Sequence, residues 1–160
     1  MTRFLTLAAM IALPAVAAVA QAPAAPTYVM KAGAGDQYEI QSSRLLLTST
    51  KNAKLRSFAS MMVTDHTKST ADVKAAAMRA GLHPAPPKLD AMGTKNVAAL
   101  RAATGTARDR LYLEQQKSAH QRALTLHQTY AQSGTAAPLK TVAASIAPVV
   151  QTHITELSTM

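Results

Sequence analysis

The chain has 160 residues and no cysteine, so disulfides and thiolate metal ligands are excluded, and its length suits one domain with one core. It carries 17 Lys plus Arg against 8 Asp plus Glu, a formal net charge of +9, which favours anionic partners such as lipid headgroups, lipopolysaccharide or acidic polymers of a cell envelope. We expect no nucleic-acid partner, because the basic residues are scattered and only 4% of the residues are aromatic.

The first 20 residues have the pattern of a secretory signal peptide. Arg3 precedes an apolar run from Phe4 to Ala20, which ends in the small residues AVA. Pro14 interrupts the run, whereas a membrane span needs roughly 20 consecutive apolar residues. The pattern therefore predicts cleavage after Ala20, a periplasmic protein, and no transmembrane segment in the mature chain.

Residues 21–34 are rich in Ala, Pro and Gly without helical periodicity, which predicts a flexible leader. The folded domain is then expected to span residues 35–160. Its first helix is predicted from Asp36, as N-cap, to Thr50. A second helix is expected from the cap residue Asn52 to Ala80, because the following Gly81 suits the left-handed position after a helix end.

The second predicted helix has an apolar stripe at helical spacing. The members of this stripe are Leu55, Phe58, Ala59, Met62, His66, Ser69, Val73, Ala76 and Ala80. A stripe that faces a core selects for apolar side chains, so the histidine in its middle marks a candidate polar site inside the fold.

Three further helices are expected after a proline-rich linker at residues 83–88. They are a short helix over residues 90–103, a long helix over residues 106–132, and a last helix that opens at Pro138. His120 and His153 lie on the inward stripes of the last two helices, and His127 follows one heptad after His120. Together these elements predict an all-α, ferritin-like four-helix bundle whose one long crossover contains the short helix.

The predicted topology brings the three histidines to one level. If the crossover spans the bundle, the helices before and after it run parallel, and His66 and His120 each lie about 14 residues, or about 21 Å, from their helix starts. The same count from the shared hinges places Glu39 and His153 within about 3 and 6 Å of that level. We therefore predict one layer that contains Glu39, His66, His120 and His153.

Several segments of the chain carry a resemblance to a known family. They are GDQYEIQSSRLLL around Glu39, FASMMVTDH around His66, GTARDRLYLEQQKSAH before and including His120, and APVVQTH ending at His153. In these segments the chain resembles the DUF4142 proteins, which are exported, ferritin-like helical proteins of bacteria with no assigned activity. The resemblance implies the same fold, an envelope location, and the matching Glu and His positions as candidate metal ligands.

The residue types favour a single metal ion over a pair of irons. Di-iron carboxylate proteins have Glu-x-x-His pairs, but Val63, Lys117 and Val150 stand three residues before the histidines of this chain. Three imidazoles and one carboxylate suit Zn²⁺ or Cu²⁺. We expect Glu39, His66, His120 and His153 as ligands, with Asp65 and Glu114 orienting the imidazoles from behind.

Three functions remain open on the sequence. The first is an exported, non-enzymatic metal-binding protein that serves envelope homeostasis or stress tolerance. The second is a metal-free structural or interaction module that contacts anionic envelope components, with the histidines forming a hydrogen-bond network. The third is a ferritin-like redox enzyme; no nucleophile–base set, phosphate loop or pair of catalytic carboxylates supports hydrolase or transferase chemistry.

Overall fold

The computed structural model describes residues 21–160, and the predicted signal peptide, residues 1–20, lies outside this part of the chain. Within the described residues the chain forms five helices, which confirms the all-α class. They are α1 (Ala25–Leu47), α2 (Ala53–Arg79), α3 (Ala91–Ala102), α4 (Gly105–Ser133) and α5 (Ala137–Leu157). None of these helices is both long and apolar enough to cross a membrane.

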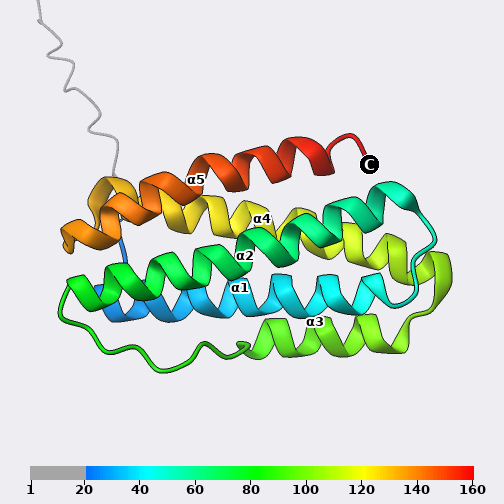
Figure 1. Ribbon diagram of the computed structural model, residues 1–160, viewed down its shortest axis with the longest axis horizontal. Coiled ribbons are helices and arrows are strands. Elements are labelled where there is room, and N and C mark those ends of the chain that lie inside the picture. Colours follow the sequence, from blue (N-terminus) through cyan, green and yellow to red (C-terminus); the bar gives the residue numbers. More distant parts are fainter. Residues whose placement is uncertain (1–20) are drawn as a thin grey trace, which may run out of the picture.

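The four long helices pack side by side, and the short α3 lies outside them (Figure 1). Contacts run from α1 to α2, from α2 to α5, from α5 to α4 and from α4 back to α1, which closes a ring; α3 packs on α1 and α4. Neighbours in this ring are antiparallel, and α2 and α4 run in the same direction, as expected for the helices before and after the crossover.

Helix ends follow the capping signals of the sequence. The Asn52 side chain accepts hydrogen bonds from the backbone N–H groups of Lys54 and Leu55, and Asp90 caps α3 through the N–H of Gly93. At the end of α2, Gly81 has φ +74° and the N–H of Leu82 donates to the carbonyl of Ala77. This Schellman arrangement needs a left-handed residue, which glycine adopts without steric cost.

The prediction of a flexible leader over residues 21–34 is wrong for most of that segment. Helix α1 begins at Ala25 and not near Asp36, with a proline in its first turn, where the missing N–H costs nothing. Gly33 lies where the linker crosses α1, since a Cβ at this position would be 2.8 Å from the Cβ of Pro87. Asp36 is therefore no N-cap: it is a buried residue inside α1.

Two apolar clusters fill the interior at different levels. One joins the N-terminal part of α1 to the C-terminal part of α2, and contains Tyr28, Val73, Tyr130, Leu139 and Val142 among others. The other contains Leu46, Leu55, Phe58, Met62, Leu100, Tyr112 and Leu157. In each of the four long helices a buried polar segment lies between the residues of these two clusters, so the polar side chains form a layer in the middle of the molecule.

Candidate metal centre

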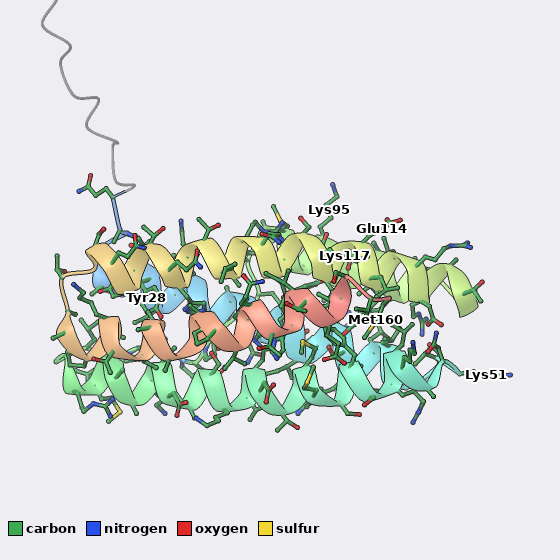
Figure 2. The ribbon with its side chains drawn as sticks, turned by 90° about the horizontal axis from the view of Figure 1, so that it is seen from above. Tyr28, Lys51, Lys95, Glu114, Lys117 and Met160 are labelled. Carbon is green, nitrogen blue, oxygen red and sulfur yellow. The ribbon has the colours of Figure 1, made fainter. Side chains whose placement is uncertain are left out.

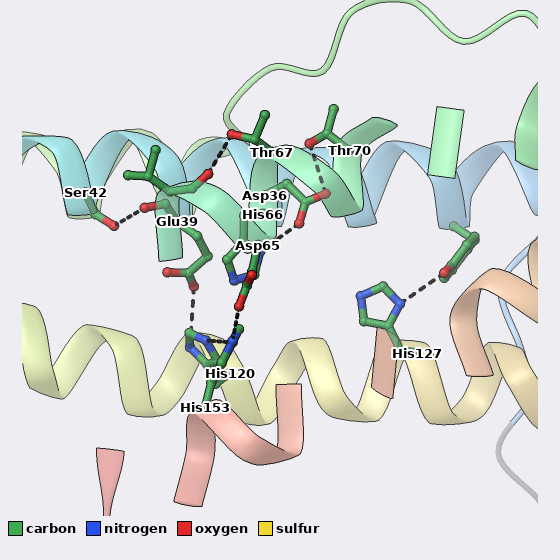
Figure 3. A network of polar contacts seen from close by, with 12 residues as sticks. Asp36, Glu39, Ser42, Asp65, His66, Thr67, Thr70, His120, His127 and His153 are labelled. Atoms are coloured by element: carbon green, nitrogen blue, oxygen red, sulfur yellow. Dashed lines mark hydrogen bonds and ion pairs between the residues drawn. The ribbon is translucent and has the colours of Figure 1, made fainter. Parts of the chain in front are cut away.

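Three of the four long helices supply one buried histidine each to the polar layer. His66 lies on α2, His120 on α4 and His153 on α5, and their exposed fractions are 6%, 0% and 2%. Their ring centroids are 5.3 to 5.7 Å apart, and one ring nitrogen of each histidine lies within 4.8 Å of the others. The predicted convergence of these three imidazoles is confirmed (Figure 3).

In each imidazole, one ring nitrogen is hydrogen-bonded to an acceptor outside the group of three histidines. We call this the outer nitrogen, and the other ring nitrogen the inner nitrogen. His66 Nδ1 donates to Asp36 Oδ1 at 2.8 Å, and His153 Nε2 donates to Asp65 Oδ2 at 3.0 Å. His120 Nδ1 donates to the backbone carbonyl of Gln116 at 3.0 Å. A carbonyl or an ionised carboxylate only accepts hydrogen bonds, so these contacts place a proton on the outer nitrogen of each ring.

The inner nitrogens then carry lone pairs that face one another. His120 Nε2 lies 3.3 Å from His153 Nδ1, and His66 Nε2 is buried with no hydrogen-bond partner within residues 21–160. Lone pairs at such distances repel unless a proton or a metal ion lies between them. Histidines that ligate metals have this arrangement, with the second ring nitrogen donating to a carboxylate or carbonyl.

Burial disfavours a proton between His120 and His153. It lowers the pKa of His120 to about 3, with His66 adding to the effect, and it also lowers the pKa of His153 despite the hydrogen bond to Asp65. The pKa of His66 is raised, because the hydrogen bond and charge of Asp36 outweigh burial. The pair that faces at 3.3 Å is thus formed by two neutral imidazoles at neutral pH, which are the ligands that zinc and copper bind.

Glu39 lies behind His120 rather than among the inner nitrogens. Its Oε1 is 3.6 Å from His120 Nδ1, and its Oε2 is buried without a hydrogen-bond partner within residues 21–160. Burial raises the pKa of Glu39 to about 7, although the charge of His66 lowers it. The close group of ligand atoms in the described part of the chain contains the three histidines and not Glu39, so direct coordination by Glu39 stays a prediction.

The two residues predicted to orient the imidazoles have different positions. Asp65 does contact an imidazole, but the ring belongs to His153 across the α2–α5 interface and not to its neighbour His66, because adjacent residues of a helix point about 100° apart. Glu114 is exposed and lines a groove between α3 and α4. It takes no part in the hydrogen bonds of the histidine layer described above.

Sequence reasoning missed Asp36 as a partner of the site. It accepts from His66 and, through Oδ2, from the hydroxyl of Thr70 at 3.0 Å. The available signal is its spacing: Asp36 and Glu39 are three residues apart and share one face of a helix. That signal is lost when Asp36 is predicted to be the N-cap, because an N-cap side chain accepts hydrogen bonds from the first backbone N–H groups of its own helix.

The comparisons with known proteins give one match. The model of the family described as "Domain of unknown function (DUF4142)" matches residues 11–160. The chain belongs to the DUF4142 family. No curated protein and no solved structure matches the chain. Membership confirms the resemblance seen in the sequence, and the chemistry of the site must be argued from its own residues.

Proposed function

We propose that this DUF4142 protein binds a single divalent metal ion through His66, His120 and His153. The observation that carries the proposal is the convergence of three imidazoles whose outer nitrogens are already hydrogen-bonded. A nitrogen-rich site favours Zn²⁺ or Cu²⁺ over Mg²⁺ or Ca²⁺, which prefer oxygen ligands. Glu39 stays in this proposal as the fourth candidate ligand, although its carboxylate lies at the outer nitrogen of His120 and would have to turn toward the inner nitrogens to coordinate the ion.

The test is a metal titration of the chain purified without a histidine tag. We expect Zn²⁺ and Cu²⁺ to bind at about one ion per chain, and His120→Ala to abolish binding because it removes one of only three convergent imidazoles. The matched control is His83→Ala, which changes a histidine of the linker, outside the polar layer. X-ray absorption should show a first shell of nitrogen ligands. Absence of binding at micromolar metal would reject the proposal.

A redox role with two irons has less support than a single ion. The carboxylates nearest to the histidines, Asp36, Glu39 and Asp65, stand behind the imidazoles and not between them. A di-iron site of the ferritin-like kind needs carboxylates that bridge the metals. Aerobic Fe²⁺ oxidation that the protein accelerates over buffer would support the enzyme instead.

The chain's charge favours a second candidate function at anionic surfaces. Lys51, Lys95 and Lys117 point outward from different elements of the molecule (Figure 2), and the net charge is +9. In this second candidate function, the histidines only form hydrogen bonds within the core, and the protein contacts anionic envelope components through its basic surface. It predicts binding to anionic vesicles that weakens steeply with salt and a melting temperature that chelators and metals leave unchanged.

We propose further that the protein functions in the periplasm. We also propose that its fold is a ferritin-like four-helix bundle, with α3 as part of the crossover. The signal-peptide pattern of residues 1–20 and the crossover between α2 and α4 support this. Fractionation should recover the protein with the periplasm, and its mass should correspond to a chain that begins at Gln21. A full-length mass in the cytoplasmic fraction would contradict the export proposal.

A further inference from the structure

The histidine layer is closed on one side and open on the other. On the α1 and α4 side, Asp36, Glu39 and Gln116 are at most 4% exposed. Between α2 and α5 lies a pocket of about 170 Å³, and two of the three histidines, His66 and His153, form part of its wall. The pocket therefore opens between these two helices toward the His66 and His153 rings, while His66 Nε2 itself is buried.

The wall of this pocket contains a second buried polar atom without a partner. Ser69 is 8% exposed, and its Oγ makes no hydrogen bond within residues 21–160. By contrast, the hydroxyls of Thr64 and Thr67 in the same helix donate to the carbonyls one turn back. Ser69 follows His66 by three residues, so the two side chains lie on the same face of the helix.

The remaining pocket residues limit what could bind. Ile146, Val149 and Val150 of α5 form an apolar wall, and Asp65 and Asp72 of α2 add carboxylates, one of them paired with Lys68. Organic ligands usually occupy pockets of about 300–1,000 Å³, so the space suits only a ligand of a few atoms. The carboxylates favour passage of a cation toward the imidazoles.

We propose that this pocket is the open side of the metal centre, where an ion held by His66, His120 and His153 takes water or a small monodentate anion as its fourth ligand, hydrogen-bonded by Ser69. The inference rests on the proposed metal binding. Three protein ligands plus one exchangeable ligand are typical of metal sites that act on small molecules, whereas purely structural sites are closed by four protein ligands. Coordination by Glu39 from the α1 side is the competing arrangement.

The experiment uses Co²⁺ as a spectroscopic probe and azide as the small anion. The chain is first loaded with Co²⁺, binding is confirmed by the visible absorption of the ion, and azide is then titrated. We expect a saturable change of the absorption bands. Ser69→Ala should raise the azide Kd about tenfold, the loss expected for one hydrogen bond to a charged ligand, whereas the control Ser60→Ala, on the exposed side of α2, should not.

A second variant tests the path. Val149 lines the pocket and is 42% exposed, so Val149→Trp can narrow the opening without filling the core. We expect the rate constant of Co²⁺ association to fall at least about tenfold, because the larger side chain covers the route between α2 and α5. The control Thr152→Trp places the same bulk at an exposed position of α5 that does not line the pocket.

The outcomes separate the two proposals. Co²⁺ binding without any effect of azide would overturn the open position and favour Glu39 as fourth ligand. Equal azide affinities for Ser69→Ala and Ser60→Ala would overturn the role of Ser69, and equal association rates for the two tryptophan variants would overturn the path. Failure of Zn²⁺, Cu²⁺ and Co²⁺ alike to bind would overturn the proposed function and this inference with it.

Discussion

Two levels of the molecule bury histidines in different ways. At one level, His127 of α4 is 4% exposed, and a hydrogen bond of 3.0 Å joins its Nδ1 and the hydroxyl of Tyr28, beside a stacked Tyr28–Tyr130 pair. At the other level, three imidazoles turn their inner nitrogens toward one another and their outer nitrogens toward acceptors. Both levels are buried, but in the described part of the chain the second level brings together three imidazoles that could hold a metal ion.

Burial alone therefore does not distinguish a candidate ligand histidine from a histidine of the core. His120 and His127 lie on one face of one helix, seven residues apart, and burial lowers the pKa of both. What separates them is the neighbouring helices: α2 and α5 bring a second and a third imidazole to His120, whereas α1 brings a tyrosine to His127. Four sets of variants test this contrast between the two levels.

The largest expected effect is on acid stability at the His127 level. Burial lowers the pKa of His127 to about 4, while the unfolded value is about 6.5, so the unfolded chain binds more protons between these values and stability falls as the pH drops through that window. The shift corresponds to roughly 3 kcal/mol. We expect His127→Gln to be less acid-sensitive by about that amount, measured as urea unfolding at pH 7 and pH 4.

The control for this measurement is His83→Gln in the linker, which should keep the acid sensitivity of the parent. Comparing each variant with the parent cancels the contribution of the histidine layer to the pH dependence of stability. In that layer, Glu39 favours the folded state at lower pH, because burial raises its pKa to about 7. An equal loss of stability in parent and His127→Gln would show that His127 is not held neutral by the fold.

The next effect is stabilisation by metal. A ligand that binds only the folded state, at about 100 times its Kd, adds about 2.7 kcal/mol to the free energy of unfolding. We expect the parent and His127→Gln to gain this stability with Zn²⁺, and His120→Gln to gain none. Thermal unfolding with Zn²⁺ and with a chelator measures it. A gain that persists in His120→Gln would place the ion elsewhere.

A smaller effect is expected from the carboxylates behind the imidazoles. Asp36→Asn and Asp65→Asn keep an acceptor oxygen but remove the charge that orients His66 and His153, so Zn²⁺ affinity should fall roughly 10- to 100-fold. The control is Glu114→Gln, since Glu114 is exposed in the groove between α3 and α4 and does not line the pocket beside the histidines. If Asp65→Asn had the same Zn²⁺ Kd as Glu114→Gln, Asp65 would have no role in metal binding. Calorimetric titration gives each Kd.

Much of this architecture was predictable because it depends on local signals. The cap at Asn52, the end at Gly81 and the stripe around His66 follow from spacing and backbone chemistry, and equal heights on parallel helices predicted that His66 and His120 meet. The start of α1 was not predictable in this way, because Gly33 has the pattern of a loop until the linker that crosses it is known. The partners Asp36 and Asp65 depend on which helices are neighbours, and that is a tertiary property.

The smallest expected effect tests that close crossing on α1, which carries both Tyr28 and Asp36 and so joins the two levels. Gly35 is exposed, and an added Cβ would meet nothing within 4 Å, so Gly35→Ala should stabilise the helix by about 0.5–1 kcal/mol. Gly33→Ala has the same gain in helix propensity, but its methyl group would lie 2.8 Å from the Cβ of Pro87. The rigid proline ring of the linker cannot easily move away from this methyl group. We expect Gly33→Ala to be the less stable variant in urea unfolding. If both variants gained equally, Pro87 of the linker would not pack against Gly33 of α1 in solution.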